Sequence, residues 1–229
     1  MVFDPLYFMF IIPPLLLSMW ASWKTRSAFK KYSKVRTMTG LTGAQAAERL
    51  LREANITDVE VVPTRGFLSD HYNPTNKRLA LSEEVFGSSS LAAVGVACHE
   101  AGHAIQHAEG YKALKLRSLL VPTANIGSKF GYFAMLIGLF MQQTGMVLAG
   151  AVLFSAVILF QLVTLPVEFD ASARAKQLAV RYGIVSSQER VGIDRVLNAA
   201  ALTYVAAAVA SLAQLLYFLV RSGLLGGRR

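Results

Sequence analysis

The chain has very little cysteine and very little histidine, and both shortages are informative. A single cysteine, Cys98, excludes an internal disulfide framework. Cys98 directly precedes His99, but neighbouring residues on a helix point about 100° apart, so we expect a small core residue and not a metal ligand. With only four histidines in 229 residues, a pair spaced four residues apart stands out from chance.

Positive side-chain charge is also missing ahead of the first apolar run, Leu6–Trp23. Only Asp4 is charged before it, so the positive n-region of a cleaved signal peptide is absent. The run is long enough to cross a bilayer, and membrane helices tolerate a kink such as Pro13-Pro14 would produce. We therefore predict an uncleaved transmembrane anchor over residues 1–23.

The segment after this anchor is strongly basic and contains no acidic residue. By the positive-inside rule the flank lies in the cytoplasm, which places the N-terminus outside. The net charge is +9, and the basic residues cluster beside apolar runs. Because no nucleic-acid-binding signature is present, we expect the lipid bilayer as partner and no nucleic acid. The basic residues of the flank are Lys24, Arg26, Lys30, Lys31, Lys34 and Arg36.

Three further apolar segments predict a multi-pass membrane protein. The chain is 54% hydrophobic, too apolar for an ordinary soluble domain. The region Phe130–Leu165 is too long for one crossing, and Gln142–Gly145 interrupts it, which predicts a hairpin of spans at about 127–142 and 146–166. A fourth span follows at 197–220. Four full spans would put the tail at 221–229 outside, and a partly re-entrant fourth run is the alternative. The expected fold class is mainly α, with a small α+β domain beside about four transmembrane helices.

The soluble part, residues 24–118, shows signals for a helix and a small sheet. Residues 39–54 have the apolar spacing of an amphipathic helix, and Thr42 can cap the N-terminus of that helix. Residues 58–62 alternate like a strand, and the turn at Asn73–Asn76 predicts a β-hairpin. The edge strand of such a sheet can bind an extended peptide. After this part we expect an interfacial helix and the span hairpin at 119–166, and a helical region at 167–196.

The strongest motif is His99-Glu100-Ala101-Gly102-His103, an H-E-x-x-H sequence inside the apolar stretch 91–105. On a helix, residues i and i+4 share one face, so His99 and His103 can bind one metal ion. Glu100 can then act as the base that deprotonates a water molecule. Small residues between the ligands leave room above the metal. This is the core of a zinc metallopeptidase; a buried structural histidine pair is the alternative interpretation.

A catalytic zinc needs a third protein ligand, and four residues are candidates. His107 continues the same face, but three ligands over two helical turns would spread over about 12 Å. His71 in the predicted hairpin and Asp170 remain alternatives. Glu168 is favoured, because it opens a predicted helix directly after the third span. A two-span hairpin returns the chain to the side it left, so Glu168 lies on the same side of the membrane as the histidines.

The sequences HEAGHAIQH and LPVEFDASARA resemble the YugP-like neutral zinc metallopeptidases of bacterial membranes, over nearly the whole chain. More distantly, they are similar to gluzincin membrane proteases of the HtpX and CAAX-processing type, whose glutamate ligand matches Glu168. The resemblance implies one Zn²⁺ per chain. Ser172 stands where those distant relatives have aspartate, so Asp170 is expected to orient a histidine ligand instead.

Together these features predict a membrane-embedded zinc metalloendopeptidase with Glu100 as general base. His71, Tyr72 and Arg174 are candidates for stabilising the transition state. The expected partner is a peptide or protein substrate, including membrane proteins, and the expected location is the bacterial inner membrane with the active site on the cytoplasmic side. The alternative function is a zinc-stabilised membrane scaffold or chaperone-like subunit with little or no proteolysis. The sequence predicts neither the substrate nor the oligomeric state.

Overall fold

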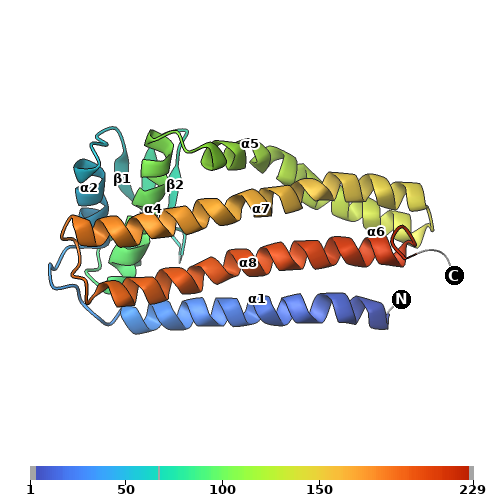
Figure 1. Ribbon diagram of the computed structural model, residues 1–229, viewed down its shortest axis with the longest axis horizontal. Coiled ribbons are helices and arrows are strands. Elements are labelled where there is room, and N and C mark those ends of the chain that lie inside the picture. The colour runs from blue at the N-terminus through green and yellow to red at the C-terminus, as the bar shows by residue number, and fades with distance from the viewer. Residues whose placement is uncertain (1–3, 67, 227–229) are drawn as a thin grey trace. The chain divides into compact units, whose positions relative to one another are not determined.

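The computed structural model describes residues 4–66 and 68–226, which form a mainly helical chain with one small sheet (Figure 1). The predicted fold class, a mainly α membrane protein, is confirmed. The chain divides into two compact units. The mixed unit comprises Ser22–Leu114 and Pro166–Leu202, and the helical unit comprises Met1–Ala21, Lys115–Leu165 and Thr203–Arg229.

The mixed unit is built around α4 (Leu91–Ala108), the helix that carries the two spaced histidines. The Ser90 side chain caps α4 by accepting a hydrogen bond from the backbone N–H of Ala93. Helix α2 (Gly43–Glu53) packs against α4, and a capping box of Thr42 and Gln45 fixes its start, which confirms the predicted role of Thr42. A buried apolar core between these elements holds α4 in place.

The sheet of the mixed unit has the strand order β1-β3-β2. Strands β2 (His71–Asn73) and β3 (Arg78–Ser82) pair antiparallel, which confirms the predicted hairpin. Strand β1 (Glu60–Thr64) lies close to the predicted strand at 58–62 and pairs with β3 in parallel. The short helix α3 (Glu83–Phe86) follows β3 directly. Because β3 is central, β1 and β2 are the two edges of the sheet, and β2 contacts α4.

Helix α7 (Thr144–Arg181) runs without a break through Pro166. The prediction that a new helix opens at Val167 was therefore wrong. Proline removes one backbone N–H, but apolar helices of this kind tolerate such a loss when neighbouring groups satisfy the freed backbone. Helix α8 (Arg190–Arg221) also begins well before the predicted span at 197–220. The polar ends of both helices thus belong to the mixed unit, while their apolar stretches belong to the helical unit.

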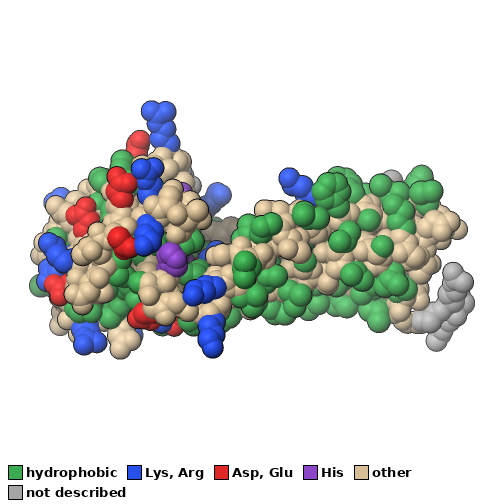
Figure 2. All heavy atoms as spheres, turned by 90° about the horizontal axis from the view of Figure 1, so that it is seen from above, with side chains coloured by type: hydrophobic (Ala, Val, Ile, Leu, Met, Phe, Trp, Pro, Cys, Tyr) green, Lys and Arg blue, Asp and Glu red, His purple; other side chains and the backbone are tan. Residues whose placement is uncertain are grey.

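The helical unit contains the membrane-type segments. Among the described residues, α1 (Pro5–Tyr32), α7 and α8 are long and apolar enough to cross a membrane. The predicted crossing at 127–142 is divided between a π-helical turn, η1 (Gly127–Gly131), and α6 (Tyr132–Phe140), which follow α5 (Lys112–Ile126). This fourth crossing remains a prediction. On the face shown in Figure 2, hydrophobic side chains are spread over the right-hand part and charged side chains are few, which suits contact with lipid.

Glycines allow α6 and α7 to pack closely inside the helical unit. A Cβ atom on Gly150 would lie 2.6 Å from the backbone nitrogen of Met135, and one on Gly131 would lie 2.8 Å from that of Phe154. Small residues at such contacts are typical of helix pairs in lipid. Met135 and Phe154 themselves are buried in the small apolar core of this unit.

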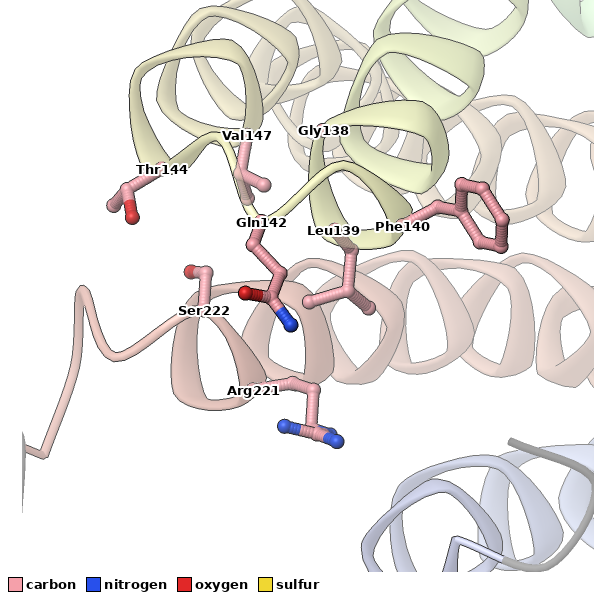
Figure 3. A pocket seen from close by; sticks show the side chains of 8 residues that line it. All are labelled: Gly138, Leu139, Phe140, Gln142, Thr144, Val147, Arg221 and Ser222. Atoms are coloured by element: carbon pink, nitrogen blue, oxygen red, sulfur yellow. The ribbon is translucent and has the colours of Figure 1, made fainter.

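Two cavities open within the helical unit. One of about 220 Å³ lies where the α6–α7 turn meets the end of α8 (Figure 3), and one of about 760 Å³ is mostly apolar and aromatic. None of the predicted catalytic or metal-binding residues lines either cavity. The smaller cavity is lined by Gly138, Leu139, Phe140, Gln142, Thr144, Val147, Arg221 and Ser222.

Candidate metal centre

His99, His103 and Glu168 meet in the mixed unit, with one ligand atom from each lying within 4.8 Å of the others. The histidines come from α4, one helical turn apart, and the glutamate comes from α7. Glu168 Oε2 lies 3.2 Å from His99 Nε2 and 3.6 Å from His103 Nε2. Of the four candidates for the third ligand, Glu168 is therefore the one that the fold brings to the histidine pair.

This cluster has the chemistry that a zinc ion needs. Two imidazole nitrogens and one carboxylate oxygen are the donor set of many catalytic zinc sites. Glu168 is only 2% exposed, and a carboxylate so deeply buried needs a cationic partner. Both Nε2 atoms face the carboxylate, while both Nδ1 atoms contact other side chains. The residues present therefore fit a bound zinc ion.

Polar side chains on α4 and α7 hold the outer nitrogens of the two histidines. Ser172 Oγ lies 3.1 Å from His99 Nδ1, and Gln106 Oε1 lies 3.0 Å from His103 Nδ1. Sequence reasoning missed both contacts. Ser172 lies four residues after Glu168 and Gln106 three residues after His103, so helical spacing alone could have placed each on the ligand face.

Asp170 reaches the histidines only through Gln106, so its predicted role in orienting a ligand ring stays a prediction. Its Oδ2 accepts a hydrogen bond from Gln106 Nε2 at 2.7 Å. The same oxygen accepts one from Arg174 Nε at 2.6 Å, and Arg174 Nη1 donates to Glu109 at 2.6 Å. Gln106 therefore stands between Asp170 and His103.

Glu100 is a buried carboxylate beside the ligands, 8% exposed. Within residues 4–66 and 68–226, no hydrogen bond or ion pair engages its side-chain oxygens, although its charge acts on His103. Burial alone lowers the pKa of the His103 imidazole, but the nearby negative charges of Glu168 and Glu100 outweigh it and raise that pKa. The pocket thus favours positive charge at the ligand cluster, as a cation site requires.

The remaining predicted residues lie outside the ligand cluster. His71 is exposed on β2, and its Nδ1 lies 2.8 Å from the carbonyl oxygen of Ser69. The Tyr72 hydroxyl lies 2.8 Å from His107 Nδ1. Burial raises the pKa of Tyr72, so its hydroxyl stays protonated and can donate. Burial also raises the pKa of the Cys98 thiol to about 12, which agrees with a core residue and not with a metal-binding thiolate.

Gly102 has a role in addition to the one expected. A Cβ atom at this position would lie 2.7 Å from the backbone oxygen of Ala171 on α7. The missing side chain thus makes room for the backbone of α7. This close contact brings α7, and with it Glu168, next to the two histidines.

A membrane-type chain in which two histidines and a buried glutamate can hold zinc fits the class of membrane metalloproteins. Sequence comparison is more specific. The chain belongs to the family described as "Putative neutral zinc metallopeptidase", whose profile matches residues 7–223. It is 47% identical over 215 residues to a Bacillus subtilis protein named "Putative membrane protease YugP", with 94% of this chain and 96% of that protein covered. No solved structure matches the chain.

Proposed function

We propose that the protein is a membrane-embedded zinc metalloendopeptidase. One observation carries the proposal: His99, His103 and Glu168 converge from two helices, and the unpaired carboxylate of Glu100 lies on the same helix as the two histidines. The family and the relative's printed name support peptide-bond hydrolysis.

In this proposal His99 Nε2, His103 Nε2 and a Glu168 carboxylate oxygen hold the metal ion. A bound zinc ion would act as a Lewis acid that lowers the pKa of its bound water to about 7 and polarises a carbonyl oxygen. The Glu100 carboxylate accepts a proton from the attacking water and delivers it to the nitrogen of the leaving amine. The buried position of Glu100 keeps its carboxylate largely away from bulk water.

The number of ligands favours catalysis over the scaffold alternative. A structural zinc site is normally closed by four protein ligands, whereas a catalytic site has three and one open position. Among the described residues the cluster contains three metal-ligating side chains. A structural site also has no need of Glu100. We therefore place the zinc-stabilised scaffold second.

We further propose that β2 receives the substrate backbone. This strand is an edge of the sheet and contacts α4, so an extended peptide can add beside it. Of the three candidates for transition-state stabilisation, we favour Tyr72, which lies on this strand with its hydroxyl against His107 Nδ1. Arg174 is already held by two carboxylates, and His71 faces its own loop.

Metal removal tests the proposal directly. Purified protein in detergent should contain about one zinc per chain by mass spectrometry, and 1,10-phenanthroline should abolish its cleavage of fluorescent casein. Activity should return with added Zn²⁺ and not with Mg²⁺, because two imidazoles and one carboxylate suit zinc better than a hard, oxygen-preferring ion. Cleavage that persists after complete removal of the metal would refute the proposal.

We also propose that the active site faces the cytoplasm of a bacterial cell and that the N-terminus lies outside. The basic flank at 24–36 sets this orientation. Two exposed positions test it: Thr75 in the mixed unit and Gln143 in the α6–α7 turn. In a Cys98→Ala background, Gln143→Cys should react with a membrane-impermeant maleimide in intact spheroplasts, and Thr75→Cys only after lysis. The reverse labelling pattern would show that the orientation is wrong.

A further inference from the structure

Gln106 is a completely buried polar side chain on the ligand helix α4, with 0% of its surface exposed. Its amide makes contacts on both sides. Oε1 faces His103 Nδ1 at 3.0 Å, and Nε2 donates to the backbone oxygen of Val167 at 2.9 Å and to Asp170 Oδ2 at 2.7 Å. A buried amide with this many partners is fixed in one orientation.

The two partners on α7 determine which way the amide points. A backbone carbonyl can only accept a hydrogen bond, and the Asp170 carboxylate, which already accepts from Arg174, can only accept as well. If the amide were flipped, Gln106 Oε1 would face two acceptors and both contacts would become repulsive. Nε2 must therefore face α7, and Oε1 must face His103.

The orientation of the Gln106 amide also determines which nitrogen of the His103 imidazole carries the proton. Gln106 Oε1 has no proton to donate, so the hydrogen bond to His103 exists only if Nδ1 carries the proton. The other nitrogen, Nε2, then has a free lone pair in the neutral ring, and it is the atom that faces Glu168. We propose that Gln106 is a positioning residue that fixes His103 in the Nδ1-protonated form, with Nε2 ready to bind the metal.

His99 differs in this respect. Its Nδ1 contacts Ser172 Oγ at 3.1 Å, and a hydroxyl can either donate or accept. Ser172 therefore orients the His99 ring without selecting its tautomer. The contrast provides a matched comparison between the two ligands of one metal ion.

The series Gln106→Met, Gln106→Glu and Ser172→Ala separates positioning from simple packing. Methionine keeps the volume and loses all hydrogen bonding, whereas glutamate keeps an oxygen that can accept from His103 Nδ1. Neither variant keeps the N–H groups that Gln106 donates to Val167 and Asp170. We expect zinc affinity, measured by competition with a chelating dye, to fall about 10–100-fold in Gln106→Met. Gln106→Glu should bind zinc more tightly than Gln106→Met, and Ser172→Ala should lose less affinity than Gln106→Met.

Thermal unfolding of the metal-free proteins shows whether each variant is folded. Equal zinc affinity in Gln106→Met and wild type would overturn the proposal, and so would equal losses in Gln106→Met and Gln106→Glu, because the role would then be structural. If Gln106→Met does not fold, Gln106→Leu replaces it, and wild-type zinc affinity in folded Gln106→Leu also overturns the proposal. The inference rests on the metal site of the proposed function, but zinc affinity is measured without any cleavage, so a failure of peptidase activity is seen separately.

Discussion

Glu100→Gln is expected to lower the rate of peptide cleavage by about 10²–10⁴-fold while zinc stays bound. Glutamine has nearly the same shape as glutamate but cannot accept a proton from water. Glu100 is not one of the three clustered ligands, so its neutralisation leaves the two imidazoles and Glu168 in place. Zinc content should therefore match that of wild type, and the loss should lie in kcat.

The control for this variant is Glu48→Gln, which neutralises an exposed glutamate on α2. It changes the net charge by the same amount and should leave cleavage unchanged. The measurement is hydrolysis of fluorescent casein, together with a proteomic comparison of membranes from cells that carry wild type or Glu100→Gln. Full cleavage by a zinc-loaded Glu100→Gln protein would exclude Glu100 as the base.

Local patterns in the sequence predicted much of the mixed unit. The capping role of Thr42, the hairpin of β2 and β3 and the helix around His99 and His103 all depend on residues close in sequence. Each follows from a short-range rule, either a cap, a turn or a helical period. The convergence of Glu168 on the histidines was also predicted, from the direction of the chain and not from local pattern.

Long-range features were not predictable in the same way. The parallel pairing of β1 with β3 depends on which strands meet in space. The alternation of apolar and polar residues along one strand does not indicate which strand pairs with it. The continuity of α7 through Pro166 depends on how the surrounding helices satisfy the freed backbone. The position of Gln106 between His103 and Asp170 requires the packing of α4 on α7, which no single segment encodes.

Gly102→Val is expected to weaken zinc binding at least tenfold and to destabilise the mixed unit by about 1–3 kcal/mol. A Cβ atom at Gly102 would already lie 2.7 Å from the backbone oxygen of Ala171, and valine adds two methyl groups beyond it. Because the obstacle is backbone, α7 itself must move away from α4. Glu168 lies one helical turn before Ala171, so the same movement pulls the third ligand from the histidines.

Gly102→Ala and Gly87→Ala complete the series for this contact. Alanine at 102 should give a smaller loss of zinc affinity in the same direction, since only one carbon is added. At Gly87 the nearest atom to a new Cβ is 3.8 Å away, an ordinary contact, so Gly87→Ala should bind zinc like wild type. Zinc competition and thermal unfolding of the metal-free proteins measure both effects. Wild-type zinc affinity in Gly102→Val would show that α4 and α7 do not need this close contact to assemble the site.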